Sequence, residues 1–353
     1  MRLAASWLLF VLLVGTGCGS SESPSGPRSV TDALGRTVRL DSSIERVVSL
    51  APNLTELAYA AGGGDRLVAV TTADDYPPAV DTLDRLSALP LDFEAVTAQR
   101  PDLVLATDQV NPPGDTETFE ALDVPIYFFS FSSLDDVFDG LRTMGTLLGT
   151  EATARDSART LEKRLACLRT RTDSISSAER PRVLVLIGDQ TLYSFGAGSY
   201  IHTLVEAAGG RSITDTLDAT APTLSEEFVL AEQPDVIVGA WGTSYDPDTL
   251  LTHHPTWDVV PALRNDRVYS LPSSLLLRPG PRLVTGAYRM AAQLHPSLGI
   301  DSTLSCPPNG SPSAAARFHV PRRETAKRSP SLQTGSLTTA GPSSFFFVPG
   351  RAL

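Results

Sequence analysis

The sequence predicts an α/β protein of two Rossmann-like lobes joined by a single long helix. The first observation is a helical pattern from Thr150 to about Asp173, where apolar residues recur at spacings of three and four. The second is a repeat, because residues 93–106 and 226–239 each place a Glu seven residues before a Pro-Asp pair that opens an apolar run. The third is the alternation of strand-like and helical segments on both sides of the long helix.

The long helix has a recognisable start and one apolar face. Thr150 is a suitable N-cap, Glu151 favours the positive first turn, and no Pro or Gly follows until Pro181. About 24 residues of helix would span roughly 36 Å. The residues expected on the buried face are Ala154, Ala158, Leu161, Leu165 and Leu168.

The first residues are typical of an export signal. Arg2 gives a positive start, and the apolar stretch 7–14 is too short to span a bilayer. Small residues then precede Cys18, so residues 1–18 resemble a bacterial lipoprotein signal, which implies a lipid attached at Cys18. A plain secretory signal is the alternative. Residues 19–29, rich in Ser, Pro and Gly, are expected to form a tether.

The first lobe is expected over residues 30–133. Its predicted elements are a hairpin over 30–40, strands at 46–51, 67–71, 103–106 and 126–131, and a helix at 54–61. In parallel sheets ligands bind beyond the carboxyl ends of the strands. Pro52, Asn53 and the loop 74–78 are therefore expected at the mouth of this lobe.

A helical connection over residues 134–179 contains the long helix, and a second lobe is expected over 180–303. The predicted elements of that lobe are strands at 182–187, 236–239 and just beyond 269, with helices at 199–208 and 283–294. Residues 304–353 are dominated by Ser, Pro and Gly without a sustained period, so we expect a disordered tail.

The composition excludes several classes of function. A formal net charge of −11 argues against nucleic acid as a partner. The five histidines do not have the spacing of metal ligands, so no metal site of the protein's own is expected. Neither a nucleophile elbow nor a phosphate-binding glycine loop is present, which makes an enzyme the weaker reading.

The run from Val30 to Pro78 resembles a known family. Its centre is Arg-Val-Val-Ser-Leu-Ala-Pro-Asn-Leu-Thr-Glu at 46–56, followed by Asp-Tyr-Pro-Pro at 75–78. Both are similar to periplasmic binding proteins for cobalamin and ferric siderophores, and the resemblance extends to about Leu298. It implies the class III fold of these receptors, in which a helical backbone joins the two lobes.

The resemblance also implies a function. The chain would be the extracytoplasmic substrate-binding component of an ABC importer, capturing cobalamin between its lobes and delivering it to a permease dimer with its ATPase. It would act as a monomer without a cofactor of its own, the metal being carried within the chelate. Ferric siderophore or haem is the alternative ligand. A two-lobed α/β enzyme and a scaffold lipoprotein are alternatives of other classes.

Site residues follow from the motifs and from this resemblance. The expected ligand-binding residues are Pro52, Asn53, Tyr76, Tyr193, Trp241 and Arg278. Glu94 and Glu227 stand in equivalent places of the repeat, and the resemblance implies that each lobe presents its Glu to an Arg of the permease. The chain lacks a family Trp at 88–91 and at Ala221, which leaves the ligand open. A disulfide between Cys167 and Cys306 is compatible with an oxidising compartment, and their pairing is left open.

Overall fold

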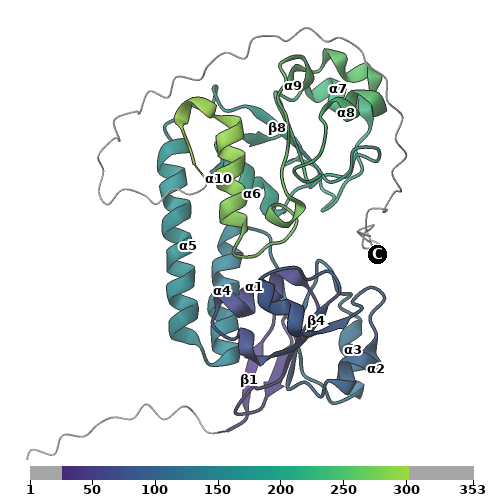
Figure 1. The fold of residues 1–353 in the computed structure, drawn as a ribbon, viewed down its shortest axis with the longest axis vertical. Coiled ribbons are helices and arrows are strands. Elements are labelled where there is room, and N and C mark those ends of the chain that lie inside the picture. Colours follow the sequence, from purple (N-terminus) through teal and green to yellow (C-terminus); the bar gives the residue numbers. More distant parts are fainter. Residues whose placement is uncertain (1–25, 302–353) are drawn as a thin grey trace, which may run out of the picture.

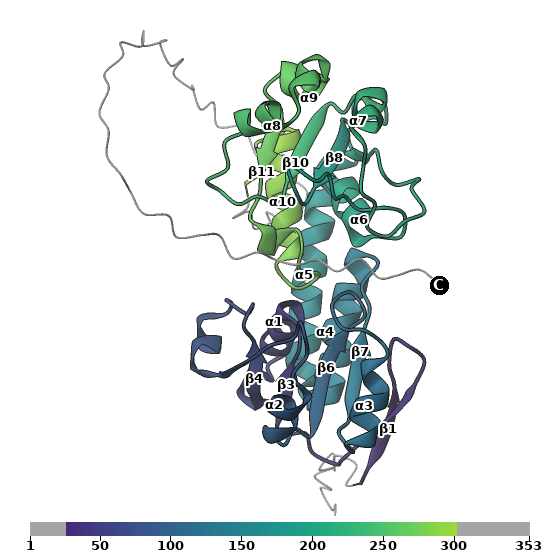
Figure 2. The same cartoon turned by 90° about the vertical axis from the view of Figure 1, so that its right-hand side faces the viewer.

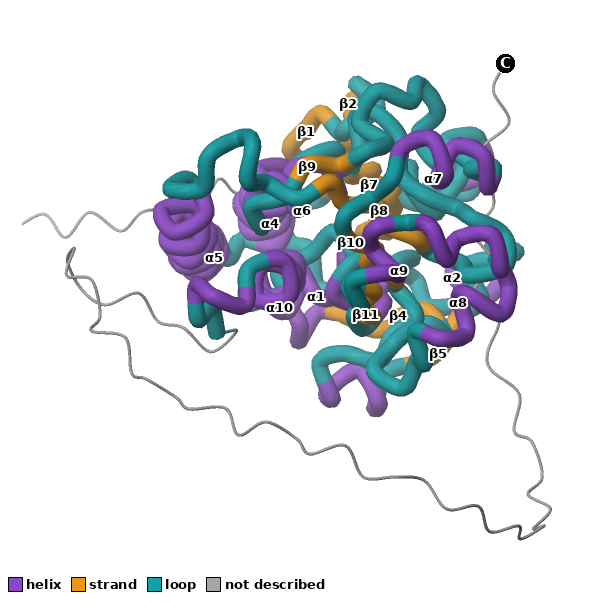
Figure 3. Tube along the Cα trace, turned by 90° about the horizontal axis from the view of Figure 1, so that it is seen from above, coloured by secondary structure: helices purple, strands orange, loops and turns teal. Residues whose placement is uncertain are grey.

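The computed structural model describes residues 26–301, which form two lobes lying along one side of a long helix, α5 (Figure 1). Each lobe contains a parallel β-sheet, and the predicted α/β fold is confirmed. Seen from above, α4, α5 and α10 lie on one side of the strands, whereas α2, α7, α8 and α9 lie on the other (Figure 3).

The first lobe has a five-stranded sheet in the order β5-β4-β3-β6-β7, with all neighbours parallel. Its strands are β3 (Val47–Ser49), β4 (Leu67–Thr71), β5 (Asp84–Leu86), β6 (Leu103–Thr107) and β7 (Ile126–Phe129). Its helices are α1 (Pro52–Ala60), α2 (Phe93–Ala98) and α3 (Asp115–Ala121). The predicted hairpin is present as the antiparallel pair β1 (Arg28–Thr31) and β2 (Thr37–Leu40).

The second lobe has a four-stranded parallel sheet in the order β11-β10-β8-β9. Its strands are β8 (Arg182–Leu186), β9 (Arg211–Ser212), β10 (Val236–Gly239) and β11 (Val268–Ser270). Its helices are α6 (Tyr200–Ala207), α7 (Glu226–Glu232), α8 (Asp248–His253), α9 (Pro261–Arg264) and α10 (Leu283–Leu294). The strand of each sheet that comes first in the sequence, β3 or β8, lies between two other strands. The chain adds the next strand on one side of it and later strands on the other side, so the direction of winding reverses there. In α/β sheets ligands bind at such a point of reversal.

The connection between the lobes is a helical hairpin of α4 (Leu134–Leu148) and α5 (Glu151–Thr172). The turn uses Gly149 at φ 64°, a left-handed conformation that glycine adopts without steric cost. Thr150 occupies the N-cap position of α5, as predicted, but its hydroxyl makes no capping bond and is buried without a hydrogen-bond partner. A capping box instead begins α4, where the Ser133 hydroxyl and the Asp136 carboxylate each accept a backbone N–H.

One hydrophobic core runs through both lobes along this hairpin. Ala154, Ala158, Leu165 and Leu168 of α5 are buried in the same cluster as strand residues of β3 and β8. Each buried Leu contributes about 1.5–3 kcal/mol by its removal from water. Smaller clusters lie on the other face of each sheet. The lobes are therefore parts of one packed body, as a single spanning helix requires.

The sequence repeat has a structural reason. Asp102 Oδ2 accepts the backbone N–H groups of Glu45 and Arg46 at 2.8 Å, which fixes β6 beside the amino end of β3. In the second lobe Asp235 Oδ2 accepts the N–H of Arg182 at 2.8 Å, which fixes β10 beside β8 in the same way. The residues preceding the two Pro-Asp pairs also share a positive φ, at 48° and 42°. In each lobe the Asp of the Pro-Asp pair thus binds the backbone at the start of the lobe's first parallel strand, β3 or β8.

The closest approach of α4 to α5 yields a prediction. A Cβ added at Gly145 would lie 2.3 Å from the Cβ of Ala154 and 3.2 Å from the Cα of Glu151. Gly145→Ala should therefore lower the free energy of unfolding by about 1–3 kcal/mol, since forcing two helices apart outweighs the roughly 1 kcal/mol gained in helix propensity. Urea denaturation followed by circular dichroism measures this difference.

Gly114→Ala is the matched control, because a Cβ there meets nothing within 4 Å and the backbone φ is −64°. The control should unfold at the midpoint of the wild type. Equal midpoints for both variants would mean that α4 and α5 accommodate the added methyl group without loss of stability.

Candidate functional site

The carboxyl edges of the two sheets face each other (Figure 2). Asn53, which follows β3, donates its side-chain amide to the carbonyl oxygen of Pro279, which lies beyond β11, at 3.3 Å. A Cβ on Gly280 would lie 3.5 Å from the carbonyl oxygen of Asn53. We call this region the interlobe face and define it by residues 49–56 and 72–78 of the first lobe and 187–193, 240–245 and 271–282 of the second.

Four charged side chains join the lobes at this face. Arg282 donates from Nε and Nη2 to the two carboxylate oxygens of Glu56, at 2.9 and 2.6 Å. Arg278 pairs with both oxygens of Asp75 and donates to the carbonyl oxygen of Ala73 at 3.0 Å. Its Nη1 also lies 3.8 Å from Glu56. Two guanidiniums of the second lobe are thus matched by two carboxylates of the first.

Burial dominates the electrostatics of Glu56, whose side chain is only 2% exposed. Burial raises the pKa of Glu56 above its ordinary value, while Arg282 and Arg278 act in the opposite direction and Asp75 adds to the rise. Glu56 in turn raises the pKa of Arg282 against the effect of burial. The pair therefore places opposite charges in a poorly solvated contact between the lobes.

The loop that carries Tyr76 is fixed at its start by Asp74. The Oδ2 atom of Asp74 accepts the N–H of Thr71 at 2.9 Å and its hydroxyl at 2.6 Å. Burial raises the pKa of Asp74, and its hydrogen bonds to threonines oppose this rise. The loop therefore leaves the carboxyl end of β4 in one defined direction.

The three predicted aromatic residues have different surroundings. The Tyr76 ring is 44% exposed, and the guanidinium carbon of Arg282 lies 4.4 Å from its centre. Tyr193 is 37% exposed in the loop after β8, whose backbone returns to Ile187 through a hydrogen bond of 2.9 Å. Trp241 is half-buried against its own lobe, with the ring of Tyr245 at 4.2 Å. Tyr76 and Tyr193 thus present aromatic surface, whereas Trp241 largely packs.

The structure brings some of the predicted ligand-binding residues together. Asn53, Tyr76 and Arg278 meet where the lobes touch, and Pro52 opens α1 beside them. Asn53 and Arg278 each donate side-chain hydrogen bonds to the opposite lobe. The sequence did not predict this structural role. Tyr193 lies in the loop after β8, where its described backbone contacts are with its own lobe.

Glu94 and Glu227 occupy the same position in two equivalent helices. Each is the second residue of its helix, after the N-caps Asp92 and Ser225, and each side chain is exposed. The two helices, α2 and α7, lie on the same side of the molecule, opposite α5 (Figures 1 and 3). Glu226 differs from its neighbour, because its carboxylate contacts His254 at 3.0 Å and the hydroxyl of Thr256 at 3.1 Å.

Sequence reasoning missed Glu56 and Arg282 as members of the site. They are 226 residues apart, and no local pattern links them. The available signal was a Glu on the helix directly after β3 and an Arg at the start of the last helix. Tyr245 was missed as well, since it stands in a loop with no strand signal of its own.

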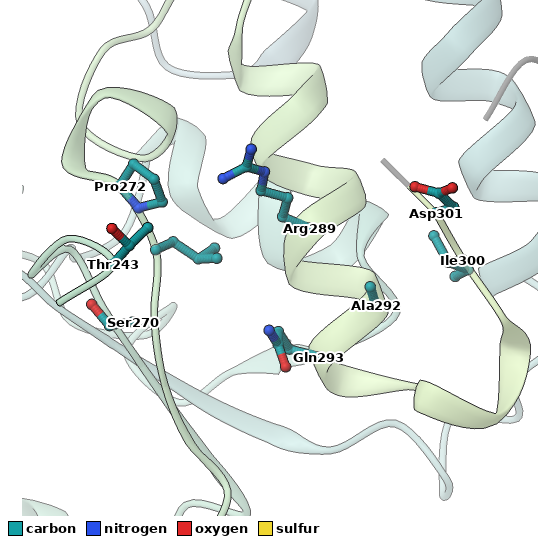
Figure 4. A pocket seen from close by; sticks show the side chains of 9 residues that line it. Thr243, Ser270, Pro272, Arg289, Ala292, Gln293, Ile300 and Asp301 are labelled. Atoms are coloured by element: carbon teal, nitrogen blue, oxygen red, sulfur yellow. The ribbon is translucent and has the colours of Figure 1, made fainter. Parts of the chain in front are cut away.

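Two cavities are described, and each shares lining residues with the interlobe face. One, of about 380 Å³, lies on the second lobe, where Arg289 and Gln293 extend from α10 toward Thr243 and Pro272 (Figure 4). The other, of about 500 Å³, lies between the end of α1, α5 and Pro281. Within residues 26–301 no group of three or more His, Cys, Asp or Glu could hold a metal ion, and no helix is long and apolar enough to cross a membrane.

Several sequence predictions concern residues beyond those described. The signal, the lipidation site Cys18, most of the tether and the tail lie outside residues 26–301. Cys167 on α5 is disulfide-bonded. Because Cys306 also lies outside the described residues, its pairing with Cys167 stays a prediction.

Comparisons with known proteins agree on one family. Residues 47–275 match the family described as periplasmic binding protein. A vitamin B12-binding protein of Vibrio parahaemolyticus is 30% identical over 241 residues, covering 68% of this chain and 85% of the relative. An uncharacterised ABC transporter substrate-binding lipoprotein of Bacillus subtilis is 25% identical over 306 residues, covering 83% and 96%.

Solved structures show the same fold. The periplasmic vitamin B12-binding protein BtuF of Vibrio cholerae superposes with a TM-score of 0.63 at 29% identity, covering 71% of this chain and 96% of that one. A periplasmic heme-binding protein of Pseudomonas aeruginosa superposes with a TM-score of 0.64 at 27% identity, covering 72% and 94%. These similarities confirm the family and the two-lobed fold inferred from the sequence.

The buried carboxylate of Glu56 yields a pH prediction. Its pKa in the folded protein lies above the ordinary 4.5, so its contribution to stability is complete below that pH and is lost as pH rises through the folded value. The difference in free energy of unfolding between the wild type and Glu56→Gln should therefore fall as the pH rises above the ordinary pKa of 4.5. Urea denaturation at several pH values measures it.

The exposed Glu117 of α3 offers the control, since Glu117→Gln reports the same chemical change at the surface. A difference that rises with pH for Glu56→Gln would contradict the prediction, because it would mean that the two guanidiniums outweigh burial.

Proposed function

The chain belongs to the periplasmic binding protein family, and we propose that it is the substrate-binding component of an ABC importer that captures cobalamin between its lobes. The family acts outside the cytoplasm, and its members are substrate-binding proteins and not enzymes, so the enzyme and scaffold alternatives are set aside. The observation that carries the proposal is the 30% identity to a vitamin B12-binding protein over both lobes. Haem or a ferric siderophore is the second candidate, since heme-binding proteins share the fold.

The charges of the interlobe face favour cobalamin over a strongly anionic chelate. Arg278 and Arg282 already pair with Asp75 and Glu56. Arg85, the middle residue of β5, donates to the carbonyl oxygen of Thr71 and pairs with Asp81 at 3.2 Å. A chelate with several negative charges would require cations that these contacts already neutralise.

The aromatic surface suits a large ligand that is partly apolar. Tyr76 and Tyr193 expose their rings at the carboxyl ends of strands in opposite lobes. Rigid aromatic side chains give a flat ring system broad contact area at a small cost in conformational entropy. We propose that these two rings make the principal contacts, with Pro52, Asn53, Trp241 and Arg278 shaping the walls. The chelate would bring its own metal, and the protein would supply no cofactor.

Glu94 and Glu227 are proposed to dock the permease. Their helix positions are equivalent, their side chains are exposed, and their helices lie on one side of the molecule. Two carboxylates placed in this way could meet one basic residue on each of two permease subunits, which would fix orientation more than affinity. The partners would be the permease dimer and its ATPase, with this chain as a monomer held to the membrane by a lipid at Cys18.

Calorimetric titration of the chain lacking residues 1–18 with cyanocobalamin tests the ligand. We expect one-to-one binding with a dissociation constant in the range of about 1 nM to 1 μM, equivalent to roughly −12 to −8 kcal/mol. Haem and a ferric siderophore are titrated in parallel. Binding of either of these without binding of cyanocobalamin would replace the proposed ligand.

Charge reversal tests the docking residues. The double variant Glu94→Lys and Glu227→Lys should reduce cobalamin uptake at least about tenfold, since two attractive contacts with the permease become repulsive. The affinity for the ligand should stay within about twofold of the wild type, because neither residue belongs to the interlobe face. Uptake is measured in cells with labelled cobalamin and affinity by calorimetry.

Glu151→Lys with Asp156→Lys is the matched control. It changes the net charge equally, but on α5, at the opposite side of the molecule (Figure 3). The control should transport normally. Loss of ligand affinity in the Glu94 and Glu227 variant would assign these residues to the pocket and refute their docking role.

A further inference from the structure

Arg282 lies between two side chains of the opposite lobe. Its guanidinium makes two hydrogen bonds with the Glu56 carboxylate, at 2.9 and 2.6 Å. The same group lies over the ring of Tyr76, with its carbon 4.4 Å from the ring centre. Glu56 comes from α1, Tyr76 from the loop after β4, and Arg282 from the N-cap of α10. Three segments distant in the sequence therefore converge on one planar cation.

The geometry requires an Arg. A guanidinium is flat and can hold a carboxylate with two parallel N–H bonds at its edge while its face stacks on an aromatic ring. An ammonium group could supply the charge but neither the paired bonds nor the stack. The carboxylate that holds Arg282 is itself fixed, because the side chain of Glu56 is 2% exposed. The guanidinium of Arg282, which lies over the Tyr76 ring, is thus held in place by the buried carboxylate of Glu56.

We infer that Glu56 and Arg282 are positioning residues that hold the Tyr76 ring in its ligand-binding orientation. The inference rests on the proposed function, in which Tyr76 contacts the ligand. Without the guanidinium, an exposed tyrosine ring on a loop would sample several rotamers, and binding would have to order it. Fixing the ring beforehand removes that cost.

The arrangement also couples Tyr76 to the placement of the lobes. Tyr76 and Glu56 belong to the first lobe, whereas Arg282 belongs to the second. If the lobes separate at this contact, the ring loses the group that orients it. The ring is therefore oriented only when the two lobes are placed relative to each other as they are in this structure.

Arg278 has a different role, although it stands four residues away. It pairs with Asp75 and with the carbonyl oxygen of Ala73, and so fixes the loop backbone on either side of Asp74. Its carboxylate partner is 63% exposed, in contrast to Glu56. Arg278 thus acts mainly on the loop and Arg282 on the ring, within one charge network in which Arg278 lies 3.8 Å from Glu56 and Arg282 lies 3.9 Å from Asp75.

The first test needs no ligand. The protein is labelled with carbon-13 in its eight tyrosine rings, and the Tyr76 signal is identified by its loss in Tyr76→Phe. Arg282→Met and Glu56→Gln should each move this signal toward the position of a solvent-exposed tyrosine, because a stacked cation changes the field at the ring. An unmoved signal in both folded variants would refute the positioning role. Arg282→Lys replaces Arg282→Met if the latter does not fold.

The second test is a double-mutant cycle on cyanocobalamin affinity. Arg282→Met should weaken binding about tenfold in the wild type but less than about twofold in the Tyr76→Leu background, since Arg282 acts through that ring. In the Tyr76→Phe background the full effect should return, because phenylalanine keeps the aromatic face. Equal losses in all three backgrounds would indicate a general structural role and overturn the inference.

Arg142→Met is the control for the loss of an ion pair. Arg142 pairs with Asp139 and Glu162 between α4 and α5, away from Tyr76. It should change neither the Tyr76 signal nor the affinity. If the wild type binds no cobalamin, the proposed ligand fails, and the ring signal still decides whether Glu56 and Arg282 position Tyr76.

Discussion

The packing of α5 into a core shared by both lobes is the constraint on which the rest of the structure depends. Its apolar face is buried together with strand residues of each sheet, so the largest hydrophobic cluster is shared by the two lobes, while each lobe keeps a smaller cluster on the other face of its sheet. Close packing of this kind resists continuous deformation. Movement between the lobes is therefore expected to be small, and the interlobe face can be built from groups that need accurate placement, such as paired charges and oriented aromatic rings.

The charged contact between the lobes is specific more than it is stabilising. Desolvating Glu56 costs free energy that the two guanidiniums only partly return, as the direction of its pKa shift indicates. A pair of well-packed apolar residues could hold the lobes together at lower cost. The ionic contact adds direction, because bidentate bonds and a stacked ring are satisfied in one relative placement only. The contact also neutralises the charges of Arg278 and Arg282, which would otherwise attract anionic ligands.

Local regularity explains how much could be predicted. The strands β4 and β10 and the helix α10 begin and end at the predicted residues, because the strands are short apolar runs and the helix has an apolar face repeated at helical spacing. The short strands β5 and β9 were missed, since Asp84–Leu86 and Arg211–Ser212 carry too few apolar residues to show a period.

The site was harder to predict than the fold. Residues placed by a strand end, such as Asn53 and Tyr76, could be found from the order of elements. The partners of Arg278 and Arg282 could not, because pairing across more than 200 residues depends on how the lobes are apposed. Sequence position likewise could not show that Trp241 lies against Tyr245 or that Asn53 binds the opposite lobe.

The repeated helix start has a consequence for assembly. Because Asp102 and Asp235 anchor equivalent strands, the helices that precede them present Glu94 and Glu227 in equivalent local frames on one side of the chain. A single polypeptide with duplicated surface features can satisfy a twofold-symmetric partner without forming a dimer itself. The two sheets also share their strand order, except that the first has one more edge strand, β5. The internal duplication is thus visible both in the order of the strands and in the surface carboxylates that the strands position.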